Sequence, residues 1–69
     1  MQDNYIDRMK TEYSDLQNKI NKLKSFINSP KALTLQDEKL ELLIIQYQVM
    51  NEYLSILHAR IKLEQYTEI

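Results

Sequence analysis

The 69-residue sequence contains no glycine, and its single proline, Pro30, is the only strong helix breaker. Such a chain leaves little room for irregular backbone, so we expect one domain of mostly regular structure. A chain of this length buries only about 60% of its unfolded surface when it folds alone, which makes its core marginal. The chain has no cysteine for disulfides, and His58 is its only imidazole for zinc. Oligomerisation is therefore the remaining way to stabilise it.

Apolar residues in the first part of the chain follow a heptad pattern, with alternating spacings of three and four. They are Ile6, Met9, Tyr13, Leu16, Ile20, Leu23 and Ile27. The positions between them are almost all polar, as in a helix with one buried face. Asn4 and Asp7 form a weak capping box at the start, and Pro30 ends the pattern because it lacks an amide proton. The pattern predicts a helix over about residues 5–27 and a loop over about residues 28–34.

A second helix is expected over about residues 35–65, with Thr34 as its N-cap and Asp37 completing a capping box. This helix carries two apolar rows, whereas one neighbouring helix covers only one. The row assigned to the first helix comprises Leu40, Leu43, Tyr47, Met50, Leu54, Leu57 and Ile61. The other, which we call the second apolar row, comprises Leu42, Ile45, Val49, Tyr53, Ile56 and Leu63. A strip this long is rarely left exposed by a soluble monomer, so we expect it to meet another subunit.

The predicted fold is all-α and consists of one domain over residues 1–69. A short connection favours an antiparallel two-helix hairpin, which we expect to assemble into a symmetric helical-bundle homo-oligomer. A loop centred near Lys31 places Met9 opposite Tyr53 and Tyr5 opposite Leu57, with an error of about one helical turn.

Composition excludes several classes of partner. Nine Lys and Arg residues against ten Asp and Glu residues give a net charge of -1, which argues against binding to a DNA or RNA duplex. The sequence shows no signal-peptide pattern and no apolar run of about 18 residues, so we expect no membrane partner. The lack of cysteine fits a reducing cytoplasm, which is the expected location.

Common catalytic signatures are missing from the sequence. Without glycine the chain has neither a glycine-rich phosphate loop nor a nucleophile elbow, and it has no cysteine nucleophile. No glutamate stands three residues before His58, as the metal sites of helical bundles require. We therefore expect no enzyme activity, no catalytic residues, no metal site and no cofactor.

A mixed group of rings and charged side chains is expected at the hairpin end remote from Pro30. The candidate ligand-binding residues are Tyr5, Arg8, Met9, Glu12, Tyr53, His58 and Arg60. Aromatic rings stack nucleobases and guanidinium groups bind phosphate, so this group can hold a compact nucleotide. The alternative is structural, with both tyrosines packing the hairpin and Arg8 pairing with Glu12. Gln46 and Arg60 interrupt apolar faces, where they either fix the register between subunits or face a shared ligand cavity.

Several less generic residues accompany the heptad positions along nearly the whole chain. The pattern comprises Arg8-Met9, Glu12, Leu16, Lys19-Ile20, Leu23 and Phe26-Ile27, then Leu42-Leu43, Gln46, Met50, Tyr53, Ile56-Leu57 and Arg60-Ile61. This pattern resembles small proteins of crAss-like and other tailed phages. The architecture is also similar to the helical-hairpin sponges with which phages counter CBASS and Thoeris immunity.

The resemblance implies an oligomeric binder that sequesters a cyclic nucleotide or ADP-ribose-type signal without cleaving it. It also implies action in the host cytoplasm and ligand pockets completed between subunits. Two alternatives stay open from the residues alone. One is a protein-binding inhibitor of host machinery, such as an anti-CRISPR or transcription inhibitor, which would use the second apolar row. The other is a purely structural coiled-coil oligomer.

Overall fold

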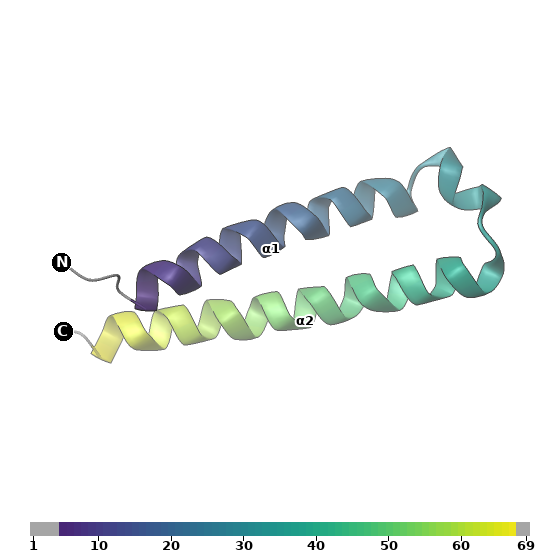
Figure 1. Cartoon of the computed structure of the whole chain (residues 1–69). Coiled ribbons are helices and arrows are strands. Elements are labelled where there is room, and N and C mark those ends of the chain that lie inside the picture. The colour runs from purple at the N-terminus through teal and green to yellow at the C-terminus, as the bar shows by residue number, and fades with distance from the viewer. Residues whose placement is uncertain (1–4, 68–69) are drawn as a thin grey trace.

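The computed structural model describes residues 5–67, with side-chain surroundings for residues 5–65. Helix α1 spans Tyr5–Ile27 and helix α2 spans Asp37–Thr67, and a short 3-10 helix, η1, spans Pro30–Thr34 between them. The two α-helices run antiparallel beside each other in an elongated hairpin of 50 × 20 × 14 Å (Figure 1). Every regular element within residues 5–67 is helical, which confirms the all-α prediction. Asn4, the predicted N-cap of the first helix, lies outside the described residues.

The start of the second helix differs from the prediction. Thr34 does not cap it, because its hydroxyl donates a hydrogen bond backwards to the carbonyl oxygen of Lys31 at 2.7 Å and so closes η1. Helix α2 begins at Asp37, and the amide of Leu40 donates to the carbonyl oxygen of Gln36 at 3.0 Å. Asp37 therefore opens the helix as its first residue, where a carboxylate favours the positive end of the helix dipole. The predicted capping box at Thr34 is wrong.

The hydrophobic core lies where the helices carry the chain termini. Its buried members are Ile6, Met9, Leu57 and Ile61, with Tyr13 packed against them. Leu57 is completely buried. Tyr53 is hydrogen-bonded to Glu12, whereas the predicted register places it opposite Met9. Helix α2 is therefore displaced by about one helical turn from the predicted register. The later start of α2 moves the centre of the connection along the chain and explains this displacement.

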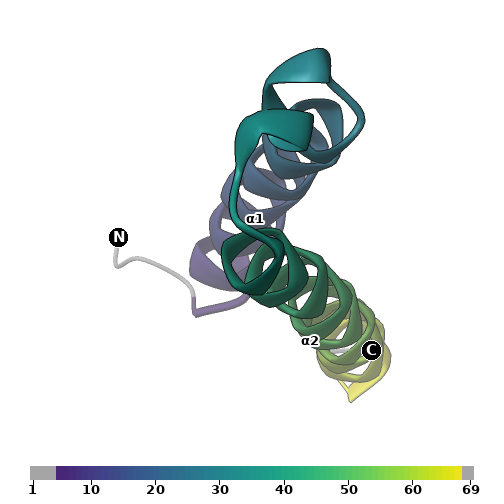
Figure 2. The ribbon, with the colours of Figure 1, turned by 90° about the vertical axis from the view of Figure 1, so that its right-hand side faces the viewer.

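The helices separate towards η1. Figure 1 shows the two ribbons closest at the end with the termini, and Figure 2 shows that their axes cross. Helix α1 covers the first row of α2 only. Every member of the second apolar row stays exposed, from 38% at Tyr53 to 65% at Leu42. The single chain therefore leaves an uncovered apolar strip along most of α2.

Candidate functional site

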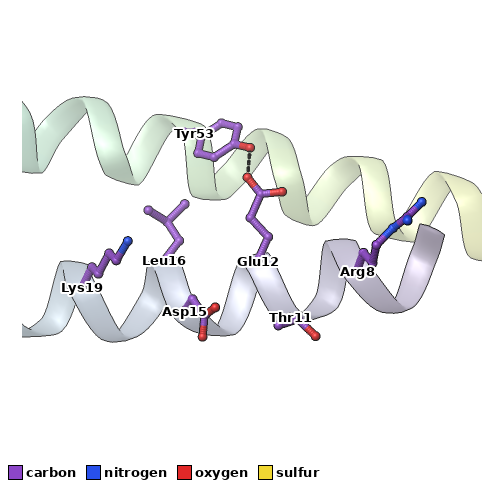
Figure 3. Close-up of a pocket in the computed structure, with 7 residues that line it drawn as sticks. All are labelled: Arg8, Thr11, Glu12, Asp15, Leu16, Lys19 and Tyr53. Carbon is purple, nitrogen blue, oxygen red and sulfur yellow. Dashed lines mark hydrogen bonds between the residues drawn. The ribbon is translucent and has the colours of Figure 1, made fainter. Parts of the chain in front are cut away.

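A hollow of about 440 Å³, here named the Tyr53 groove, lies between α1 and α2 (Figure 3). Its lining comprises Arg8, Thr11, Glu12, Asp15, Leu16, Lys19 and Tyr53. All but Tyr53 belong to α1, where residues three or four apart share one face of the helix. Tyr53 extends from α2 on the opposite side. The groove therefore has an aromatic wall facing a mostly charged helix face.

Charges of both signs line the Tyr53 groove. Arg8 and Lys19 lie at its two ends, and Glu12 and Asp15 lie between them (Figure 3). The two cations offer N–H donors to phosphate oxygens, whereas the two carboxylates accept hydrogen bonds from amino or amide groups. All four side chains are exposed, so the groove is open to solvent in the single chain.

Tyr53 and Glu12 connect the two helices across the groove. The Tyr53 hydroxyl donates a hydrogen bond to Oε2 of Glu12 (Figure 3). This bond is the main reason that the pKa of Tyr53 is raised above its ordinary value of 10.0, because ionisation of the hydroxyl would remove the donor. The hydrogen bond fixes the tip of the ring, and Tyr53 as a whole residue is 38% exposed. Tyr53 therefore presents an aromatic surface in a fixed position at the groove.

Tyr5 also connects the two helices, but here the tyrosine belongs to α1 and the glutamate to α2. The Tyr5 hydroxyl of α1 is hydrogen-bonded to Glu64 of α2, and this bond is the largest cause of a raised pKa at Tyr5. The positive charge of Arg60 acts on both Tyr5 and Tyr53 and lowers their pKa values against this trend. Arg60 therefore lies within electrostatic reach of both tyrosines.

The predicted site residues fall into three groups. Arg8, Glu12 and Tyr53 line the groove together, and Tyr5 and Arg60 lie close to each other at the end of the hairpin with the termini. Two residues lie elsewhere. Met9 lies in the core and is 4% exposed. The ring of His58 makes a tilted contact with the ring of Tyr13, with 5.8 Å between the ring centroids. Burial leaves Met9 little surface for a ligand, and His58 is not part of the groove lining.

Sequence reasoning missed four residues of the lining. They are Thr11, Asp15, Leu16 and Lys19. Leu16 belongs to the heptad row that the sequence predicts to be buried, and Asp15 and Lys19 belong to the polar face of the same helix. The available signal was their spacing, because they continue the face of α1 that carries Arg8 and Glu12. Lys19 matters most, since it supplies the second cation.

Other features of the described residues are less suited to a polar ligand. A hollow of about 330 Å³ near η1 is lined by Lys24, Ile27, Asn28, Ile44, Tyr47 and Gln48. Within residues 5–67, no three His, Asp or Glu side chains gather in a way that could hold a metal ion. Neither helix of the described part combines the length and hydropathy needed to cross a bilayer.

Comparison with known proteins gives two matches along most of the chain. A family model described as Sequestin matches residues 3–63, a range that contains the whole groove. The chain is also similar to an "Uncharacterized 7.5 kDa protein in denB-rIIB intergenic region" of Enterobacteria phage T4. The two are 42% identical over 57 residues, which cover 83% of this chain and 89% of that protein. No solved structure matches the chain significantly.

Proposed function

The chain belongs to the Sequestin family, and from this premise we propose that it sequesters a small nucleotide signal of host immunity without cleaving it. The family name implies sequestration, and the relative from phage T4 supports a role during phage infection. The proposed ligand is a cyclic nucleotide or an ADP-ribose-type signal, as the likeness to CBASS and Thoeris sponges implies. The proposed place of action is the cytoplasm of the infected bacterium.

The observation that carries the proposal is the arrangement of Tyr53 between two separated cations. An exposed tyrosine ring can stack on a nucleobase. The hydrogen bond to Glu12 holds the ring of Tyr53 in position. Arg8 and Lys19 are eleven residues apart on α1, which corresponds to about 16 Å along the helix axis. Two cations at that spacing suit a ligand with more than one phosphate or with phosphates at separate positions.

The carboxylates give the proposed groove its selectivity. Glu12 and Asp15 balance the charges of Arg8 and Lys19, so the groove has little general attraction for phosphate. A bare phosphate or a nucleic-acid backbone gains nothing from a carboxylate, whereas the amino groups of a base donate to it. The groove therefore favours a complete nucleotide over phosphate alone.

The groove favours retention of the ligand over its hydrolysis. Thr11 is the only hydroxyl-bearing aliphatic side chain of its lining, and that hydroxyl donates to the backbone carbonyl of Asp7 at 3.1 Å. No histidine lines the groove to act as a base towards it. We therefore propose binding without turnover.

Binding measurements test the proposal directly. Calorimetry and thermal shift with cyclic dinucleotides, cyclic trinucleotides and cyclic ADP-ribose isomers should identify a ligand that stabilises the protein. Arg8→Gln and Lys19→Gln should each weaken its binding, whereas Lys24→Gln, outside the groove, should bind like the parent. Ligand released by heating should be chemically unchanged.

The same measurements can overturn the proposal. If no compound of the panel binds the parent protein, nucleotide sequestration is wrong. If the parent instead captures a host defence or transcription protein through the second apolar row, the chain is a protein-binding inhibitor.

A further inference from the structure

Four residues of the second apolar row form a straight line along α2. Leu42, Val49, Ile56 and Leu63 recur every seven residues, and each is at least 56% exposed. A heptad line of large aliphatic side chains is the surface that another helix covers in a coiled coil or bundle. Helix α1 cannot cover it, because α1 packs on the first row through Leu57 and Ile61.

The charges beside this line identify the helix that covers it. Glu41 and Lys62 lie on the same side of the line, close to its opposite ends, and both are exposed. Two antiparallel copies of α2 place Glu41 of each copy opposite Lys62 of the other. We propose that α2 pairs with α2 of a second copy in this antiparallel orientation, through the second apolar row.

Parallel pairing of the same surfaces does not bring these opposite charges together. It leaves Glu41 of each copy at one end of the pair and Lys62 at the other end, about 32 Å apart along the helix axis.

This pairing has a consequence for the Tyr53 groove, and that consequence rests on the proposed function. Tyr53 belongs both to the groove and to the second apolar row, with Val49 and Ile56 one turn away on either side. A two-fold axis near the middle of α2 therefore brings the two Tyr53 grooves together. The second copy then lies beside the open side of each groove and encloses a ligand that a single chain leaves exposed.

Cross-linking of cysteine variants tests the orientation, because the chain has no cysteine of its own. A mixture of Glu41→Cys and Lys62→Cys proteins should form a covalent dimer with a short thiol-reactive cross-linker. Each variant alone should cross-link poorly, since antiparallel pairing separates identical ends. Lys24→Cys on α1 serves as an exposed control outside the pairing surface. Efficient cross-linking of Glu41→Cys with itself would overturn the antiparallel arrangement.

Charge reversal provides a second test without cross-linking. Sedimentation should show a several-fold rise in the dimer Kd for Glu41→Lys or Lys62→Glu, and the double variant should recover parent-like pairing. A parallel dimer predicts neither this loss nor this recovery, because Glu41 and Lys62 lie at its opposite ends. Circular dichroism confirms that the variants stay helical. A parent protein that sediments as a monomer at every accessible concentration would overturn the pairing, whether or not it binds a nucleotide.

Discussion

At the scale of single residues, Tyr53 and Tyr5 each connect the two helices, and Tyr53 also lines the proposed site. Each hydroxyl bonds a glutamate of the opposite helix, Glu12 for Tyr53 and Glu64 for Tyr5. Both hydroxyl groups therefore help to hold the two helices together, whereas the exposed ring of Tyr53 remains available to a ligand. These two contributions can be separated by mutation, because phenylalanine keeps the ring and removes the hydroxyl.

We expect Tyr53→Phe to retain most nucleotide binding and Tyr53→Ala to lose it by roughly tenfold or more, since only alanine removes the stacking surface. Calorimetry with the ligand identified for the parent protein measures both effects. Tyr47→Ala is a matched control, because Tyr47 lies at the hollow near η1 and not in the Tyr53 groove. Equal binding by Tyr53→Ala and the parent would contradict a stacking role for Tyr53.

The raised pKa values of both tyrosines predict a loss of stability in alkaline solution. The folded chain holds the hydroxyl protons more tightly than the unfolded chain, whose tyrosines titrate near 10.0. This contribution is complete below pH 10.0 and is lost as the pH rises through the higher folded pKa values. Thermal melts across this range should fall less steeply for the Tyr5→Phe/Tyr53→Phe variant. An unchanged slope would show that these bonds do not stabilise the hairpin.

At the scale of elements, the sequence predicted the limits of α1, which depend on local signals. It did not predict the start of α2 or the helix register, which depend on the linker. The heptad spacing and Pro30 predicted a first helix over 5–27, and α1 spans Tyr5–Ile27. The start of α2 and the helix register depend on how η1 closes, and the hydroxyl of Thr34 is equally suited to a cap or a 3-10 turn. The groove was predicted in part, through Arg8, Glu12 and Tyr53. Lys19 was not predicted, because the predicted register places Tyr53 opposite Met9, about one helical turn farther from Lys19.

The packing of α2 on α1 depends strongly on Leu57, the completely buried member of the core. Leu57→Ala should destabilise the protein by about 2–5 kcal/mol, through lost burial and the cavity left behind. Chemical denaturation followed by circular dichroism measures this change. Leu33→Ala is the control, since Leu33 of η1 is 82% exposed and its truncation should have little effect. Similar losses for both variants would contradict a core centred on Leu57.

At the scale of the whole molecule, the hairpin has one small core at one end and an uncovered apolar row along α2. A net charge of -1 gives the chain no long-range attraction for anions, so ligand capture depends on enclosed local contacts. Assembly supplies both missing features in the proposed arrangement. It covers the second apolar row, and it encloses the Tyr53 groove.

Folding coupled to assembly makes stability depend on protein concentration, because dilution favours the separated and less stable chains. The Tm of the parent protein should therefore rise with concentration in calorimetric scans without any nucleotide. Ile56→Asp, at the centre of the second apolar row, should lower the Tm and remove its concentration dependence, since a charge there opposes burial. Lys10→Asp, an exposed change on α1 outside the groove and the row, should retain the dependence. A parent Tm that stays constant over a hundredfold dilution, equal to that of Ile56→Asp, would mean that the hairpin is stable alone and that its exposed row serves another partner.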